Sequence, residues 1–157
     1  MNQSFQIMPV PYEQFAPLFR LSDAELQSLG ARRMIVNENP GFPCRASLAD
    51  AAVGETVLLL PYAHHDVTSA YRASGPIFIR KDAETARLAA GEVPVMLRQR
   101  LLSIRAYDGS ATMIDAEVTP GAGVEVVIRR LFANERVHYL HIHNAGPGCF
   151  NCRVVRV

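Results

Sequence analysis

Short strand-like runs separated by turn sequences are the feature that most restricts how this chain can fold. Runs rich in β-branched and aromatic residues predict strands at 33–36, 44–48, 56–62, 76–80, 101–107, 113–118, 137–143 and 149–157. Most neighbouring runs are joined by connections of hairpin length, and such connections suit antiparallel strands, whereas parallel strands need a long crossover. The sequence therefore predicts an α+β fold with a mainly antiparallel β-sheet.

Two or three short helices are expected beside the strands. The segment 22–25 has the sequence Ser-Asp-Ala-Glu of a capping box, which predicts a helix over 23–29 that Gly30 ends in a left-handed conformation. A second short helix is expected after Asp82 as its cap. Apolar residues at helical spacing over 124–131 predict a third, amphipathic helix.

The size and charge of the chain exclude several classes of protein. Its 157 residues, 49% of them hydrophobic, predict one domain over 1–157 with a core of its own. A formal net charge of +1 argues against a nucleic-acid partner held by bulk positive charge. No apolar stretch approaches the roughly 20 residues of a membrane span, so no membrane association is expected. Three cysteines favour a reducing, cytoplasmic setting over a disulfide framework.

The last two predicted strands form a hairpin that concentrates the chemically versatile side chains. Because side chains alternate along a strand, Tyr139, His141 and His143 are expected on one face. A five-residue loop would pair His143 with Cys149 and His141 with Asn151 on that polar face. The core face is expected to carry Leu140, Ile142, Phe150, Cys152 and Val154.

One interpretation of the polar face is a metal site. His141 and His143 would bind a divalent metal ion, with Cys149 or Asp108 as the third ligand, because two imidazoles spaced by one residue on a strand can reach the same ion. A plainer interpretation is that both histidines bond to backbone and water while Cys149 only packs.

A second interpretation of the same face is a reactive thiol. Cys149 would be the nucleophile and His143 its activating base, with Asn144 or Asn151 orienting the imidazole ring. Cys152 is expected to be buried and unreactive on the opposite face. The adjacent histidines 64 and 65 are expected to be solvated in a loop.

Arginines at strand ends indicate a site for an anion, because guanidinium groups bind carboxylate or phosphate in a bidentate manner. The segments 44–45, 105–108 and 141–149 are expected to meet around one cavity. The predicted ligand-binding residues are Arg45, Arg105, Tyr107, Asp108, His141 and Asn144. Alternatively, each arginine pairs with a nearby acid such as Asp108 or Asp115.

Five segments resemble one protein family. Pro-Gly-Phe-Pro-Cys-Arg at 40–45, Leu-Leu-Leu-Pro-Tyr at 58–62, Ser-Gly-Pro-Ile-Phe at 74–78, Arg-Ala-Tyr-Asp at 105–108 and His-Ile-His-Asn followed by Gly-Cys-Phe within 141–150 are similar to the bacterial domain-of-unknown-function family 1203. The resemblance implies a stand-alone bacterial protein of about this length. It implies no activity, cofactor or catalytic residue.

Three classes of function remain open from the sequence. The first is binding of a small anionic molecule in a polar pocket at strand ends. The second is a metal- or thiol-dependent hydrolase or transferase that uses His141, His143 and Cys149. The third is a protein-interaction module, which an uncovered apolar patch near Tyr62 and Tyr71 would favour.

Overall fold

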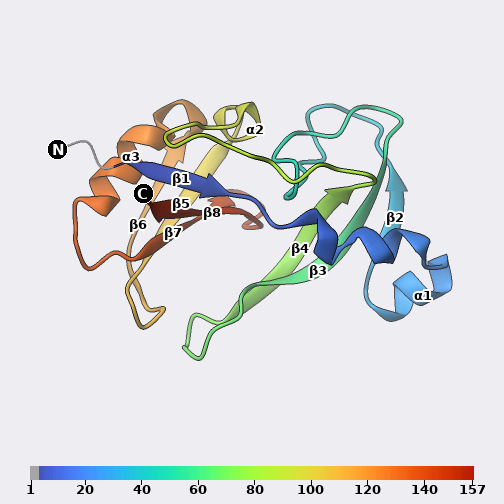
Figure 1. Ribbon diagram of the computed structural model, residues 1–157, viewed down its shortest axis with the longest axis horizontal. Coiled ribbons are helices and arrows are strands. Elements are labelled where there is room, and N and C mark those ends of the chain that lie inside the picture. The colour runs from blue at the N-terminus through green and yellow to red at the C-terminus, as the bar shows by residue number, and fades with distance from the viewer. Residues whose placement is uncertain (1–3) are drawn as a thin grey trace.

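Two antiparallel sheets make up most of the computed structural model of the protein, which describes residues 4–157 (Figure 1). The five-stranded sheet has the order β1 (Phe5–Met8), β8 (Phe150–Arg156), β7 (Tyr139–Asn144), β5 (Leu101–Tyr107), β6 (Met113–Pro120). The three-stranded sheet has the order β2 (Arg32–Ile35), β3 (Thr56–His65), β4 (Ala73–Arg80). All strand pairings within these sheets are antiparallel. The predicted α+β class is confirmed.

The helices are short. They are α1 (Asp23–Ser28), α2 (Val95–Arg98) and α3 (Val124–Phe132), with 3-10 turns at Tyr12–Gln14, Ala16–Arg20 and Gly121–Gly123. The predicted capping box is present at α1, because the Ser22 hydroxyl accepts from the Glu25 amide at 3.1 Å and the Glu25 carboxylate accepts from the Ser22 amide at 3.0 Å. No helix within residues 4–157 is long and apolar enough to cross a membrane.

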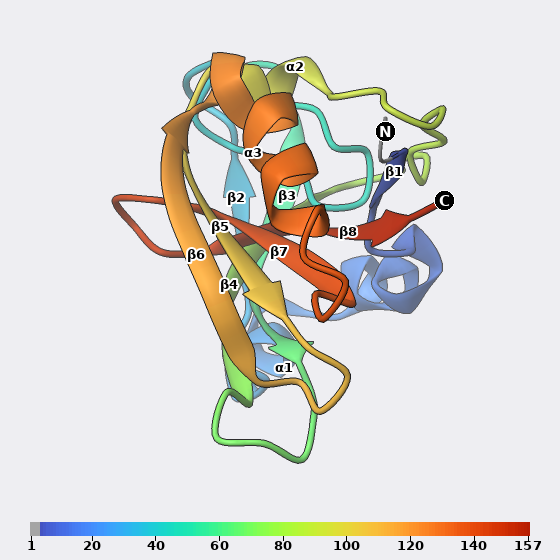
Figure 2. The same cartoon turned by 90° about the vertical axis from the view of Figure 1, so that its left-hand side faces the viewer.

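The five-stranded sheet has one face covered by helices and one face turned to the other sheet. Figure 2 shows α3 lying over the face formed by β5, β6 and β7. That side holds the larger core, in which Leu140 and Cys152 are fully buried. A second core holds the buried residues of β3 and β4 together with Phe150 of β8. The face away from α3 is therefore where groups from both sheets meet.

Two predicted elements are wrong. Residues 44–48 form a turn with isolated bridges instead of a strand, because the Leu48 amide bonds back to the Cys44 carbonyl at 2.9 Å and Leu48 has a φ of 53°. Strand β3 accordingly pairs with β2 and β4. No helix follows Asp82, which has a φ of 57°; an irregular segment runs from β4 to α2 instead (Figure 1).

The register of the C-terminal hairpin also differs from the prediction. Strands β7 and β8 pair Ile142 with Cys152 but His143 with Phe150, so one extra residue, Asn151, interrupts the ladder as a bulge. His143 therefore does not pair with Cys149, and His141 pairs with Arg153 instead of Asn151. The bulge moves Phe150 from the predicted core face to the histidine face.

Candidate functional site

Strands β5 and β7 place a row of polar and aromatic side chains on the face turned away from α3. Their register pairs Ser103 with His143, Arg105 with His141, and Tyr107 with Tyr139. Residues directly opposite each other in an antiparallel pair share a face of the sheet. Arg105, Tyr107, His141 and His143 therefore lie on the same face of the sheet.

Strand β3 brings two further histidines to this face. The pairing of β3 with β4 is irregular between Tyr62 and His65, so the ordinary alternation of side chains is interrupted there. The ring of His64 lies 5.0 Å from that of His143, and the ring of His65 lies 4.9 Å from that of His141, as measured between centroids. The expectation that residues 64 and 65 form a solvated loop is wrong. We call these four residues the histidine cluster.

Burial keeps three members of the histidine cluster uncharged at neutral pH. Burial, together with the neighbouring His65 and His143, lowers the pKa of His141 to about 2. Burial likewise lowers the pKa of His64 and of His143 to about 4, with a contribution from the positive charge of Arg105 in both cases. Neutral imidazoles offer one hydrogen-bond donor and one acceptor each.

The hydrogen-bond network determines which ring nitrogen carries the proton in two of these residues. His65 Nδ1 lies 2.8 Å from the Tyr71 carbonyl and His143 Nδ1 lies 2.9 Å from the Gly148 carbonyl, so both nitrogens donate. With the proton on Nδ1, the Nε2 atom of a neutral imidazole is an acceptor. His65 Nε2 accepts from the Tyr139 hydroxyl at 2.6 Å.

Three buried imidazole nitrogens have no hydrogen-bond partner within residues 4–157. They are Nδ1 of His64, Nδ1 of His141 and Nε2 of His143. A buried polar atom without a partner costs roughly 1–3 kcal/mol, and folded proteins contain few of them. Their concentration in one cluster marks this face as a candidate binding site.

A cavity of about 440 Å³ lies beside the histidine cluster. Its lining comes from both sheets and from the segment after β1, and comprises Met8, Pro9, Val10, Pro11, Tyr62, His64, His65, Asp66, Val67, Gly109, Ala111, Tyr139, His141, Phe150 and Arg153. One side of the cavity is therefore apolar, and the other carries imidazole, phenol and guanidinium groups together with the carboxylate of Asp66, which pairs with Arg72 at 3.1 Å. We call this space the inter-sheet cavity.

Positive charge at the inter-sheet cavity is not balanced by a paired acid. The Arg153 guanidinium lies 4.4 Å from the centroid of the Tyr139 ring, and Arg105 Nε donates to the Ser103 hydroxyl at 3.4 Å. Neither arginine forms an ion pair with any carboxylate in the described part of the chain. The alternative in which Arg105 pairs with a nearby acid is therefore wrong, and Asp115 pairs with Arg130 instead.

Arg45 lies outside the cavity lining and has a structural role. Its side chain is only 1% exposed, and its guanidinium donates to the Phe150 carbonyl at 2.7 Å and to the Pro43 carbonyl. Burial lowers the pKa of Arg45, while its interaction with Cys149 raises it. Arg45 thus fastens the turn after residue 43 to the start of β8.

Asp108 and Asn144 are likewise engaged by their own loops. The Asp108 carboxylate accepts from the Ser110 hydroxyl at 2.8 Å and from the amides of Ser110 and Thr112 at 2.9 and 3.1 Å, which closes the hairpin between β5 and β6. The bond from the Ser110 hydroxyl, followed by those from the two amides, lowers the pKa of Asp108. The Asn144 carbonyl accepts from the Asn151 amide at 2.7 Å. Neither side chain lines the inter-sheet cavity.

The cysteines do not form the predicted thiol–imidazole pair. Cys149 is half-buried, and its sulfur accepts from the Asn144 amide at 3.6 Å, whereas His143 Nδ1 donates to Gly148. Cys152 is fully buried, as predicted, and burial raises its pKa to about 12. All three cysteines are free thiols.

The metal interpretation finds no arranged ligand set. Within residues 4–157, no group of three or more His, Cys, Asp or Glu side chains is placed so that it could hold one metal ion. Asp108, one proposed third ligand, is committed to its turn, and Cys149, the other, lies against Arg45 and Asn144.

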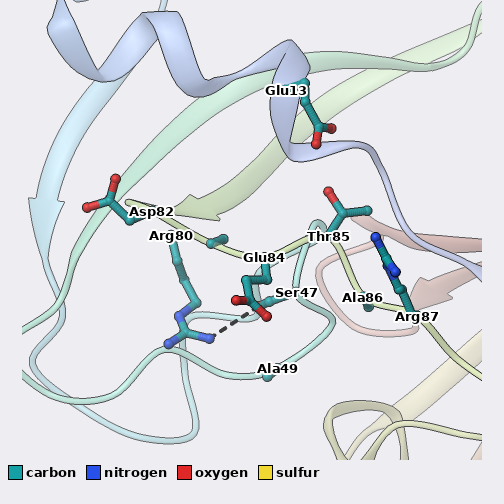
Figure 3. Close-up of a pocket in the computed structure, with 10 residues that line it drawn as sticks. Glu13, Ser47, Ala49, Arg80, Asp82, Glu84, Thr85, Ala86 and Arg87 are labelled. Atoms are coloured by element: carbon teal, nitrogen blue, oxygen red, sulfur yellow. Dashed lines mark hydrogen bonds between the residues drawn. The ribbon is translucent and has the colours of Figure 1, made fainter.

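A second and larger cavity, of about 1110 Å³, lies along the segment that follows β4 (Figure 3). Its arginine from β4, Arg80, is paired with Glu55 at 2.8 Å and donates to the Ser47 hydroxyl at 3.3 Å. Asp82, Glu84 and Arg87 are exposed there. This cavity contains no buried unpaired polar group, so we place the candidate site at the inter-sheet cavity.

Four residues of this site are not among the binding or catalytic residues predicted from the sequence: His64, His65, Tyr139 as a hydrogen-bonding group, and Arg153. Tyr139 and Arg153 fall on the histidine face by strand alternation, which is a usable signal. The histidines of β3 carry no comparable signal, because their orientation depends on a bulge.

The chain belongs to a family whose members are described as proteins of unknown function, DUF1203, and the family model matches residues 41–156. The match confirms the resemblance and includes every strand except β1 and β2. No curated protein and no solved structure shows significant similarity to the chain.

Proposed function

We propose that the protein binds a small anionic molecule in the inter-sheet cavity. The observation that carries this proposal is the meeting of an unpaired guanidinium, that of Arg153, with buried imidazole nitrogens that lack partners. A guanidinium without a carboxylate partner attracts an anion, and the imidazoles supply hydrogen bonds to the rest of the molecule.

The size and walls of the cavity fit a small organic anion. A volume of about 440 Å³ lies within the range of small-molecule sites, roughly 300–1000 Å³. The rings of His64 and Phe150 stack at 5.1 Å with an interplanar angle of 13°, and together with Pro9 and Val10 they offer flat, apolar surfaces. A planar carboxylate satisfies both walls at once.

The cysteine side chains bear on the cellular location of the protein. Three free thiols, two of them buried, support a reducing and cytoplasmic location. The thiol-dependent alternative has little support, because Cys149 contacts Asn144 and Arg45 and lies outside the cavity lining.

Calorimetric titration with sodium benzoate tests the proposal, with benzyl alcohol as the uncharged probe of the same shape. We expect benzoate to bind more tightly than benzyl alcohol. Arg153→Gln should weaken benzoate binding about tenfold or more, because a hydrogen bond to a charged group contributes roughly 1.5–3 kcal/mol.

Arg87→Gln is the matched control, since Arg87 is an exposed arginine of the other cavity (Figure 3). It should leave benzoate affinity unchanged. Equal loss in both variants, or equal affinity for benzoate and benzyl alcohol, contradicts the proposal. Arg105→Ala is expected to weaken binding less than Arg153→Gln, because Arg153 lines the cavity and Arg105 does not.

A further inference from the structure

We propose that Tyr139 and His65 form a nucleophile–base pair that hydrolyses small esters in the inter-sheet cavity. This inference rests on the proposed function, because both residues line the cavity in which the anion, here the carboxylate product, is held. It adds an activity and assigns a role to each side chain.

The hydrogen bonds around His65 have the geometry that activates a nucleophile. The Tyr139 hydroxyl donates to His65 Nε2 at 2.6 Å, and His65 Nδ1 donates to the Tyr71 carbonyl at 2.8 Å. A nucleophile within hydrogen-bond reach of a base, with that base oriented by a third group, is the arrangement found in covalent catalysis. The third group here is a backbone carbonyl.

Packing holds the pair in this geometry. His65 is 3% exposed, and its ring lies 4.3 Å from that of Tyr107 between centroids. Tyr107 also stacks on Tyr139 at 5.2 Å with an interplanar angle of 16°. Burial raises the pKa of Tyr139 and the adjacent charge of Arg153 lowers it, so the phenol needs the imidazole to take its proton.

The reaction proceeds in two balanced steps. Tyr139 Oη attacks the ester carbonyl carbon while its proton passes to His65 Nε2; the bond from that carbon to the alcohol oxygen then breaks, and the alcohol leaves with the proton from His65. Water next attacks the acyl group on Tyr139, giving one proton to His65. The imidazole returns that proton to the tyrosine oxygen, and the carboxylic acid is released.

His141 can stabilise the oxygen that becomes negative in each step. Its Nδ1 has no partner, and its ring lies 5.4 Å from that of Tyr139 between centroids. With the imidazole proton on Nδ1, this ring supplies a single hydrogen-bond donor, which suits the one negative charge of an acyl intermediate. Phosphoryl transfer needs a denser set of cations around its charged oxygens, and Arg153 is the one arginine or lysine in the cavity lining. The site therefore favours esters of carboxylic acids.

Stopped-flow hydrolysis of 4-nitrophenyl acetate, followed by acid quenching and mass mapping of the peptides, tests this inference. We expect a burst of nitrophenol and an acetyl group on Tyr139. Tyr139→Phe should abolish the burst and the acetylation, and His65→Gln should lower the acylation rate roughly 100-fold, which is within the range for loss of a general base.

A control variant separates this activity from reactions at the surface. His138→Gln removes an exposed imidazole that is next to Tyr139 in the chain but does not line the inter-sheet cavity. It should retain the burst. Absence of acetyl-Tyr139 in the natural protein overturns the inference, and so does an undiminished burst in Tyr139→Phe.

Benzoate binding distinguishes failure of this inference from failure of the proposed function. Binding without acetylation overturns the esterase alone, whereas absence of benzoate binding overturns the proposed function. Mapping of acetyl groups on the natural protein shows whether Tyr139 is acylated, even where a variant does not fold.

Discussion

At neutral pH His64, His141 and His143 are uncharged, because burial in the folded protein holds their pKa values far below those of exposed imidazoles. Because these imidazoles stay uncharged in the folded protein, the free energy of unfolding decreases at lower pH. An unfolded chain takes up protons on histidine below about pH 6.5, whereas His141 does so in the folded protein only near pH 2 and His143 only near pH 4.

Stability should therefore fall as the pH drops below 6.5. The sign follows because the unfolded state binds more protons there, so the stabilisation is complete above that pH and is lost below it. His141 and His143, which are 2% and 1% exposed, each contribute, at roughly 1.4 kcal/mol per pH unit for a group that titrates only in the unfolded state. Urea unfolding at pH 7.5 and 5.0 measures the difference.

His143→Gln should flatten this pH dependence, since it removes one titrating group, while His138→Gln should leave it unchanged because His138 is exposed. Equal stability of the natural protein at the two pH values would show that the buried imidazoles are not held neutral.

At the scale of elements, the sequence predicts correctly those helices and strands whose formation depends on nearby residues and not on packing against distant parts of the chain. The capping box of α1 and the strand at 101–107 were predicted and are present. The 44–48 run was predicted as a strand because of its composition, but its backbone turns and its Arg45 bonds to β8. The orientation of His64, His65 and Phe150 depends on bulges, and these bulges arise from the pairing of β3 with β4 and of β7 with β8. Residue composition does not reveal that pairing.

The approach of α2 to the turn before α3 depends on a glycine. A Cβ atom at Gly121 would lie 2.1 Å from the Leu97 carbonyl oxygen and 2.6 Å from the Arg98 Cα, both of which belong to the backbone of α2. Gly121→Ala should therefore lower the free energy of unfolding by at least about 2 kcal/mol, since the backbone must shift. Thermal and urea unfolding measure this.

Gly146→Ala is the matched control, because a Cβ atom there would meet nothing within 4 Å. Its free energy of unfolding should stay within about 0.5 kcal/mol of the natural value. A Gly121→Ala variant as stable as Gly146→Ala would mean that α2 does not pack against this turn.

At the scale of the whole molecule, the candidate site exists because two sheets meet. The polar face of β5 and β7, with Arg105, Tyr107 and His141, can be predicted from strand alternation. Of these three residues, His141 lines the cavity. Other lining residues come from β3, and their position follows from how the three-stranded sheet packs on the five-stranded one. That packing depends on contacts distant in sequence, such as the bond between Tyr139 and His65.

The histidine side chains report directly on whether the inter-sheet cavity binds an anion. The chain has five histidines, and His138 is the exposed one that lies outside the cluster. Nitrogen-15 NMR of the imidazoles during a benzoate titration should show the signals of His64, His65 and His141 shifting together to a common saturation point while His138 stays constant. Signals of the cluster that do not respond, or that drift without saturation in parallel with His138, would contradict binding at this site.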